Sequence, residues 1–170
     1  PNAVNIMLDP GLTFGSGSHA TTSMCLQWLE KNIHDGSTVI DYGCGSGILA
    51  IAAALLGAAR VIAVDNDPQA ITATIENAKR NNIRKGVIET YLPEQLPEDR
   101  AALRSDILVA NILAEPLMRL AEDLSHLIKP KGRIALSGLL VEQADELLEH
   151  YGSWFEMDEA VLSGEWAQLS

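Results

Sequence analysis

The residues best suited to chemistry lie in a glycine cluster that follows a short apolar run. Gly43, Gly45 and Gly47 alternate with small residues, and Asp41 stands two positions ahead of the first glycine. Glycines let the backbone pass close beneath a ligand, and the free N–H groups of a following helix point at it. Ile48 occupies the position where a dinucleotide fingerprint, G-x-G-x-x-G, requires its third glycine. This spacing disfavours a nicotinamide-dependent oxidoreductase.

Two polar residues end later apolar runs, where a parallel sheet brings them toward the same ligand. Asp65 lies 22 residues after Gly43, close to the offset at which an acid accepts the ribose hydroxyls of a nucleotide. Asn111 follows the predicted strand 106–110, and its amide offers one acceptor and two donors. An ordinary loop acid at Asp65 and a helix cap at Asn111, ahead of Pro116, are the alternative interpretations.

The stretch ahead of the first predicted helix also holds candidates. Three glycines and a proline make the segment 9–18 flexible enough to close over a ligand, which Phe14 could then cover. Thr22 stands at the start of a helix, so its hydroxyl is expected to cap that helix. His19 is expected to be a solvated loop side chain and is left out of the catalytic residues.

Strand and helix patterns alternate from about residue 37. Strands are predicted at 38–41, 61–64, 87–92, 106–110 and 133–136, and helices at about 48–56, 68–81, 116–127 and 141–150. The punctuation between them is specific. Gly57 is expected to cap one helix, and Asp67 with Pro68 to begin the next. Residues 93–105 are expected to form a surface connection with about one helical turn.

This alternation predicts a mostly parallel sheet with helices on both faces. Residues 129–132 are expected to close the fourth helix, and a terminal pair formed by 154–161 and 166–169 would add an antiparallel strand at one side. At 170 residues the chain favours one domain that buries a core without disulfides or metal. Cys25 and Cys44 form no CxxC pair and no pattern of disulfides, so a reducing compartment is expected. The sequence shows no cluster of residues with the spacing of metal ligands.

The charge balance narrows the class of partner. Lysine and arginine number 12 against 23 aspartates and glutamates, for a formal net charge of −11. Binding of nucleic acid relies on clustered cations, so this balance argues against it and suits a cationic ligand or a basic protein. The longest apolar stretch, 48–59, has 12 residues and is too short to span a membrane.

The acid followed by G-x-G-x-G and the acid after the second strand resemble the first two motifs of class I S-adenosylmethionine-dependent methyltransferases. Three segments extend the resemblance. Residues 8–22 (LDPGLTFGSGSHATT), 39–47 (VIDYGCGSG) and 109–114 (VANILA) are similar to the ribosomal protein L11 methyltransferase (PrmA) family. The resemblance covers nearly all of the chain.

The resemblance implies a doubly wound, Rossmann-like α/β fold with a mostly parallel seven-stranded sheet and an antiparallel closing strand. Its implied cofactor is S-adenosyl-L-methionine. The cofactor contacts it implies are Thr22, Gly43, Gly45, Asp65 and Asn111, with Asn111 also the catalytic residue that faces the incoming amine. Residues 1–22 would be a linker and cofactor-covering loop, and 23–170 the catalytic domain. Because the chain begins at Pro1 instead of methionine, we expect a fragment that lacks the family's amino-terminal recognition domain.

The function implied by the resemblance is that of a cytoplasmic, monomeric protein-lysine N-methyltransferase. Its expected substrate is a basic large-subunit ribosomal protein, methylated on lysine side chains and on the amino-terminal amine. Amine-methylating relatives commonly place prolines and an aromatic residue after the asparagine, whereas Ile112, Leu113 and Ala114 follow Asn111 here. Two alternatives therefore stay open: a methyltransferase of RNA or of a small amine, and a cofactor-binding fragment that is inactive without its recognition domain.

Overall fold

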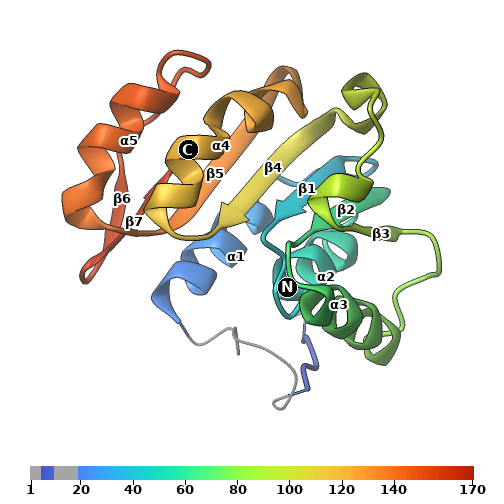
Figure 1. Cartoon of the computed structure of the whole chain (residues 1–170). Helices are drawn as coiled ribbons and strands as arrows, with labels where there is room; N and C mark the ends of the chain where they lie inside the picture. The colour runs from blue at the N-terminus through green and yellow to red at the C-terminus, as the bar shows by residue number, and fades with distance from the viewer. Residues whose placement is uncertain (1–4, 10–18) are drawn as a thin grey trace.

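A seven-stranded sheet runs through the computed structural model, which describes residues 5–9 and 19–170 (Figure 1). The strand order is β3-β2-β1-β4-β5-β7-β6. The five parallel strands are β1 (Thr38–Tyr42), β2 (Arg60–Val64), β3 (Ile88–Tyr91), β4 (Ser105–Asn111) and β5 (Ile128–Leu140). The strand β7 (Trp166–Leu169) runs antiparallel to both β5 and β6 (Val161–Ser163). The predicted α/β sheet with an antiparallel strand at one side is confirmed.

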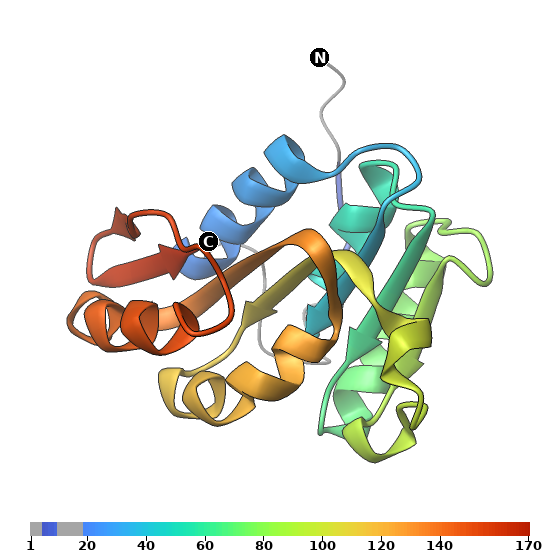
Figure 2. The same ribbon diagram turned by 90° about the horizontal axis from the view of Figure 1, so that it is seen from above.

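Helices cover both faces of this sheet. On one face lie α1 (Ala20–Asn32), α2 (Ile48–Leu55) and α3 (Pro68–Arg80), and on the other α4 (Ala114–His126) and α5 (Ala144–Tyr151). Figure 2 shows α1 on the side of β4 and β5 opposite to α4 and α5. Successive side chains of a strand point to opposite faces, so Val39 joins the core under α1 and α2 while Ile40 joins the core under α4 and α5. None of the described helices is long and apolar enough to cross a membrane.

The helix punctuation agrees with the sequence at several points. Gly57 directly follows Leu56, the residue at the carboxyl-terminal cap of α2, and has a φ of +108°. The side chain of Asp67 accepts a hydrogen bond from the Gln69 N–H, and Pro68 is the first residue of α3. Between β3 and β4 the connection contains two short 3₁₀ helices, η1 (Pro93–Gln95) and η2 (Arg100–Leu103), where one turn was expected.

Two other predictions are wrong near the carboxyl terminus. The strand β5 begins at Ile128, so the segment 129–132, expected to close a helix, belongs to the strand. The register between β4 and β5 shifts there, and Lys131 takes a φ of +66°, so the extra residues bulge out without ending the strand. Residues 154–160 form no strand, because Phe155 and Met157 pack against the core beneath α4 and α5 instead.

The remaining differences concern where helices begin. The fourth helix begins at Ala114, two residues before Pro116. The predicted helix 141–150 begins as a 3₁₀ turn, η3 (Val141–Gln143), which leads into α5. Both helices follow parallel strands, so both begin at the edge of the sheet where the strands have their carboxyl ends.

This edge is where an open α/β sheet binds ligands. The chain leaves β1 toward β2 on one side, and β4 lies on the other side of β1. Such a reversal of strand order separates the loops that follow the two strands and opens a crevice between them. The glycine cluster follows β1 and Asn111 ends β4, so the fold brings both to this crevice.

Candidate functional site

The turn after β1 is held in its shape by the backbone of β2. The N–H groups of Gly43 and Cys44 both donate to the carbonyl oxygen of Val64, at 2.7 and 3.0 Å. Gly43 and Gly47 have φ angles of +85° and +81°, a region in which residues with a side chain are strained. A Cβ atom on Gly43 would also collide with the side chain of Ile112, at the end of β4. The glycine at 43 thus lets the β1 and β4 loops approach each other.

Asp41 supports the same turn from within the core. Its side chain is fully buried, and its Oδ2 accepts a hydrogen bond of 3.0 Å from the N–H of Ala50, in the first turn of α2. The other oxygen, Oδ1, has no hydrogen-bond partner within the described part of the chain. Burial, together with the nearby charge of Asp65, raises the pKa of Asp41 to about 7. A partly unsatisfied acid in the core is costly, so its place beside the glycine turn calls for a functional reason.

Asp65 joins the two loops that follow β1 and β2. Its Oδ2 accepts from the N–H of Gly45 at 2.9 Å, and its Oδ1 accepts from the N–H of Asp67 at 3.0 Å. A carboxylate has about four lone-pair positions, so two remain for a ligand. The geometry therefore fixes the direction of the acid and leaves it acceptor capacity.

Thr22 and Asn111 meet across the end of the sheet. The Asn111 Nδ2 donates to the Thr22 Oγ1 at 3.3 Å, although the residues stand 89 positions apart. Neither is a helix cap: α4 has Leu113 as its N-cap, and α1 has His19. His19 is exposed to solvent, as expected, and its ring also accepts from the Thr21 N–H and lies 4.8 Å from the Trp166 ring.

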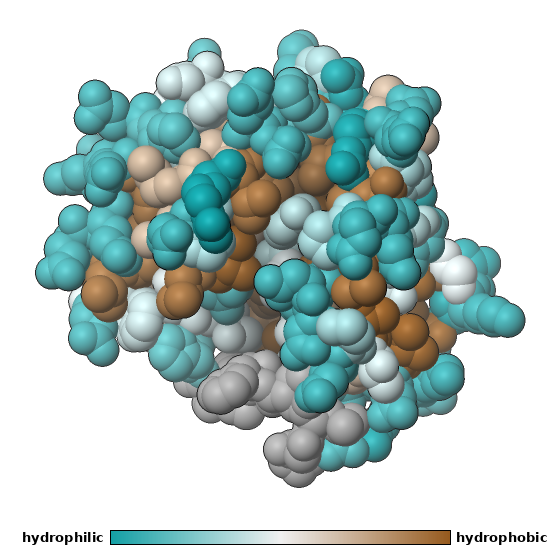
Figure 3. Space-filling view, viewed as in Figure 1, coloured by the Kyte–Doolittle hydropathy of each residue, from teal (hydrophilic) through white to brown (hydrophobic). Residues whose placement is uncertain are grey.

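A cavity of about 390 Å³, within the size range of small-molecule sites, is lined by two of the predicted site residues, Gly43 and Asp65, whereas Thr22, Gly45 and Asn111 do not line it. Its lining includes Gly43 from the glycine turn and Asp65 from the end of β2, together with apolar side chains of Ile112 and Leu120. Figure 3 shows apolar side chains in a hollow on the face that carries α4. The cavity joins an apolar wall to an acid, which is the combination that a nucleoside requires.

A larger cavity of about 760 Å³ lies at the opposite edge, around the start of β5, and is lined by Lys129, Lys131 and Arg133 among others. None of the predicted site residues lines it. Because ligands of open parallel sheets bind at the carboxyl ends of the strands, we assign the candidate site to the smaller cavity.

Three supporting residues were not predicted. Ile112 packs against Gly43, as described above, while Thr74 and Asn77 hold the glycine turn from α3. The Thr74 hydroxyl lies 3.3 Å from the Gly45 carbonyl oxygen, and the Asn77 Nδ2 donates to the Ser46 carbonyl oxygen at 2.9 Å. The available signal was the spacing of Thr74 and Asn77, which places two polar residues on the apolar face of a helix.

Of the predicted covering segment 9–18, only Asp9 belongs to the described residues. Phe14 and the three glycines of the segment lie outside them. The predicted division between residues 22 and 23 falls within α1.

Comparison with known proteins gives consistent matches. The family model described as ribosomal protein L11 methyltransferase (PrmA) matches residues 1–170. The ribosomal protein L11 methyltransferase of Tolumonas auensis is 54% identical over 169 residues, which are 99% of this chain and 56% of the relative. That of Aeromonas salmonicida is 55% identical over 170 residues, all of this chain and 57% of the relative. The chain thus spans a little more than half the length of these relatives.

Solved structures agree on the fold. A ribosomal protein L11 methylase from Lactobacillus delbrueckii subsp. bulgaricus superimposes with a TM-score of 0.82 at 35% identity, over 96% of this chain and 82% of that one. A 16S rRNA guanine methyltransferase from T. thermophilus, solved with AdoMet and guanosine, superimposes with a TM-score of 0.74 over 92% of this chain and 44% of that one. At 19% identity the second match bears on the fold alone.

Proposed function

Because the chain belongs to the ribosomal protein L11 methyltransferase (PrmA) family, we propose that it is the catalytic part of an enzyme that methylates ribosomal protein L11 with S-adenosylmethionine. The acceptors would be lysine side chains and the amino-terminal amine. A ribosomal protein substrate would place the reaction in the cytoplasm. Residues 23–170 would form the catalytic domain, and 1–22 the linker and covering loop, with recognition of the substrate assigned to the length that the relatives have in addition.

The observation that carries the proposal is the position of Asp65 between the two loops at the cavity. Both of its oxygens are oriented by backbone N–H groups, at 2.9 and 3.0 Å, and its remaining lone pairs suit the two hydroxyls of a ribose. Gly43 and Gly45 would lie beneath the same nucleoside, and the apolar side chains of Ile112 and Leu120 beside its base. The residues present therefore fit an adenosine-bearing cofactor.

The proposed role of Asn111 follows from the hydrogen bond it makes to Thr22. Since its Nδ2 donates to the Thr22 hydroxyl at 3.3 Å, its Oδ1 is the atom left to accept a hydrogen bond from an incoming amine. This bond would aim the nitrogen lone pair at the reacting carbon, and orientation of this kind supplies most of the catalysis in a direct displacement. The cofactor, when bound, supplies a methyl group on a positively charged sulfur.

An amine must lose a proton before it can accept a methyl group. For a lysine with a reference pKa near 10.4, deprotonation at pH 7 costs about 4.6 kcal/mol. An apolar surrounding disfavours the ammonium form and reduces this cost. Ile112 and Leu113, which follow Asn111 in the chain, would supply such surroundings, and the proton would leave to water.

Cofactor binding is the first test. A thermal-shift titration with S-adenosylmethionine, S-adenosylhomocysteine and NADH should raise the melting temperature with the first two ligands alone. At 100 times the dissociation constant the expected stabilisation is about 2.7 kcal/mol. Asp65→Asn should weaken binding of S-adenosylhomocysteine by about tenfold or more, since the amide can no longer accept from two N–H groups and a ribose.

Asp67→Asn is the matched control, because an asparagine still caps α3 and the substitution lies two residues away. Equal affinities of wild type and Asp65→Asn would refute the ribose assignment. A shift with NADH alone would exclude the methyltransferase.

The acceptor is tested by transfer of a labelled methyl group to ribosomal protein L11, to ribosomal RNA and to free lysine. We expect label on the protein. Preferential labelling of RNA would favour the alternative enzyme. If the chain were an inactive cofactor-binding fragment, adding the segment that its longer relatives have would increase methylation, so no increase would exclude that alternative.

A further inference from the structure

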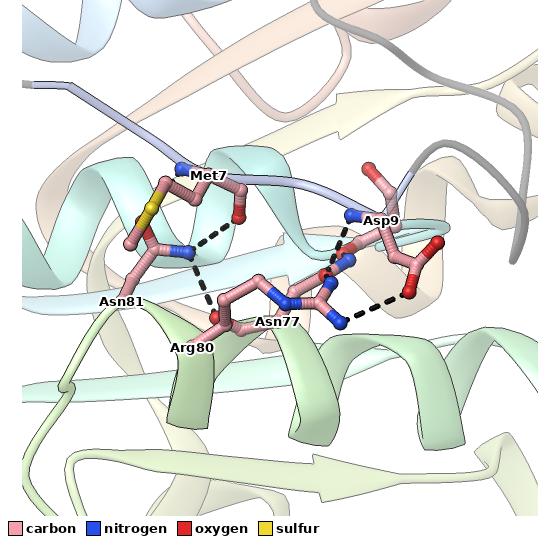
Figure 4. A network of polar contacts seen from close by, with 6 residues as sticks. Met7, Asp9, Asn77, Arg80 and Asn81 are labelled. Carbon is pink, nitrogen blue, oxygen red and sulfur yellow. Dashed lines mark hydrogen bonds and ion pairs between the residues drawn. The ribbon is translucent and has the colours of Figure 1, made fainter.

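The short segment 5–9 is fastened to the carboxyl-terminal half of α3. The Met7 N–H donates to the Asn81 Oδ1 at 2.8 Å, and the Asn81 Nδ2 donates to the Met7 carbonyl oxygen at 2.7 Å. The Asp9 N–H donates to the Asn77 Oδ1 at 3.1 Å, and its carboxylate pairs with Arg80 at 2.9 Å. Figure 4 shows the segment running alongside α3 with these side chains between them. We call these contacts the clasp.

Asn77 belongs both to the clasp and to the glycine turn. Its Oδ1 accepts from the Asp9 N–H and, at 3.2 Å, from Arg80, while its Nδ2 donates to the Ser46 carbonyl oxygen at 2.9 Å. The side chain is fully buried. A single amide group therefore connects the segment 5–9 to the loop on which the cofactor site is built.

The geometry makes this connection stiff. One helical turn earlier on the same face, the fully buried Thr74 lies with its hydroxyl 3.3 Å from the Gly45 carbonyl oxygen. The backbone of Thr74 also packs so closely on Gly47 that a Cβ there would lie 3.0 Å from its Cα. Thr74 thus fixes α3 against the glycine turn at a second contact. Because α3 cannot shift, a rotation of the Asn77 amide has to change the conformation of the turn.

We propose that Asn77 is a positioning residue that couples docking of the segment 5–9 on α3 to the conformation of the glycine turn, and so to the affinity for the cofactor. The dependence on the cofactor rests on the proposed function. Because coupling between two sites is reciprocal, the clasp strengthens cofactor binding, and a bound cofactor strengthens the clasp.

The test disrupts the clasp without touching the glycine turn. Asn81→Ala removes both hydrogen bonds to Met7, together with the bond of 2.8 Å that the Asn81 Nδ2 donates to the Asn77 carbonyl oxygen. Asn32→Ala is the matched control: Asn32 also ends a helix, donates to the carbonyl oxygen four residues earlier, and bonds a distant segment through Arg133. We expect Asn81→Ala to weaken binding of S-adenosylhomocysteine by about fivefold, and Asn32→Ala to leave it unchanged. Equal effects of the two variants, or no effect of either, would overturn the coupling.

Amide hydrogen exchange decides the coupling even without a ligand. In the ligand-free chain, Asn81→Ala should speed exchange of the Gly47 N–H, which donates to the Cys44 carbonyl oxygen at 2.8 Å, whereas Asn32→Ala should not. Exchange at Gly47 that is the same in both variants and wild type refutes the coupling. If wild type fails to bind S-adenosylhomocysteine, the proposed function fails, and the exchange rates still decide whether clasp and turn are connected.

A second pair of variants separates coupling from general damage. Arg80→Met removes the ion pair with Asp9 and one hydrogen bond to Asn77, and Arg80→Lys restores the charge. We expect the affinity for S-adenosylhomocysteine to fall about threefold in the first and to recover in part in the second. With wild type, S-adenosylhomocysteine should in turn slow exchange of the Met7 and Asp9 N–H groups. An unchanged rate at both amides on binding contradicts the reciprocal effect.

Discussion

The hydrogen bond between Thr22 and Asn111 joins α1 to the carboxyl end of β4 at the candidate site, and we expect it to be measurable. Thr22→Val keeps the shape of the side chain but removes the hydroxyl. A double-mutant cycle with Asn111→Ala should show a coupling of about 0.5–1.5 kcal/mol in the free energy of unfolding. Thermal or urea denaturation of the four proteins measures it. Strict additivity would contradict a direct bond, and Thr72→Val, an exposed threonine of α3, serves as the control.

Asp41 predicts an unusual dependence of stability on pH. Its pKa is about 7 in the folded chain against 3.8 for an ordinary aspartate. Between these values the folded chain keeps a proton that the unfolded chain releases, so stability from this residue is lost as the pH rises from about 4 to 7. The difference of about 3 pKa units corresponds to roughly 4 kcal/mol.

Asp41→Asn should therefore flatten the decline. The variant gains stability relative to wild type as the pH rises, by up to about 4 kcal/mol at pH 8. Urea denaturation at pH 4.5, 6 and 8 measures the difference. Asp99→Asn, which removes an acid but keeps a capping oxygen for η2, controls for the change in net charge. Parallel curves for wild type and Asp41→Asn would contradict the prediction.

Some residues of the candidate site could be located from the sequence, and others could not. Asp65 and Asn111 could be located from the sequence because each ends a parallel strand, and topology alone brings strand ends to one edge. Their roles toward a cofactor remain predictions. The spacing of Thr74 and Asn77 marks two polar positions on the apolar face of α3, but it does not show that they hold the glycine turn, because that role depends on how α3 packs against the turn.

At the scale of an element, the glycine turn makes a sharp prediction. Gly43 and Gly86 have similar φ angles, +85° and +89°, but only Gly43 faces a neighbour, Ile112. Gly86→Ala should cost about 1 kcal/mol of stability from backbone strain. Gly43→Ala adds the collision and should cost about 2–4 kcal/mol and weaken cofactor binding.

Ile112→Ala in the background of Gly43→Ala should return part of the lost stability, because it removes the group that the new methyl meets. Chemical denaturation of the single and double variants gives the comparison. Equal losses for Gly43→Ala and Gly86→Ala would show that the two loops do not meet as described.

Elements with strong local signals could be predicted closely, and those shaped by neighbours could not. The strands β1, β2 and β4 and the helix α3 lie within a residue or two of their predicted bounds, because apolar runs and the Asp67–Pro68 start are local features. The strand β5 exceeds its prediction, since pairing with β4 and β7 carries it through a Lys-Pro-Lys-Gly segment that looks like a turn. Residues 154–160 contribute aromatic and apolar side chains to the core without pairing as a strand.

At the scale of the whole molecule, a net charge of −11 should govern encounters with a basic partner. We expect the association rate of a labelled lysine-rich peptide to fall about tenfold or more between 10 and 300 mM salt, because screening shortens the reach of the field from about 30 Å to less than 8 Å. Stopped-flow fluorescence measures the rate. The same peptide with acetylated lysines is the control, and an equal dependence on salt for both peptides would contradict steering by charge.

In the proposed methyltransferase, the buried Asp41 and the nearby Asp65 would have a consequence for turnover. A methyl donor enters with a positive sulfur and leaves as a neutral thioether, so the two forms differ by one charge at nearly constant shape. Two acids beside the glycine turn favour the charged form, and they do so more strongly once Asp41 is ionised above pH 7. The turn that holds the donor would thus also help to expel the spent molecule, and mildly alkaline conditions would ease the exchange of one for the other.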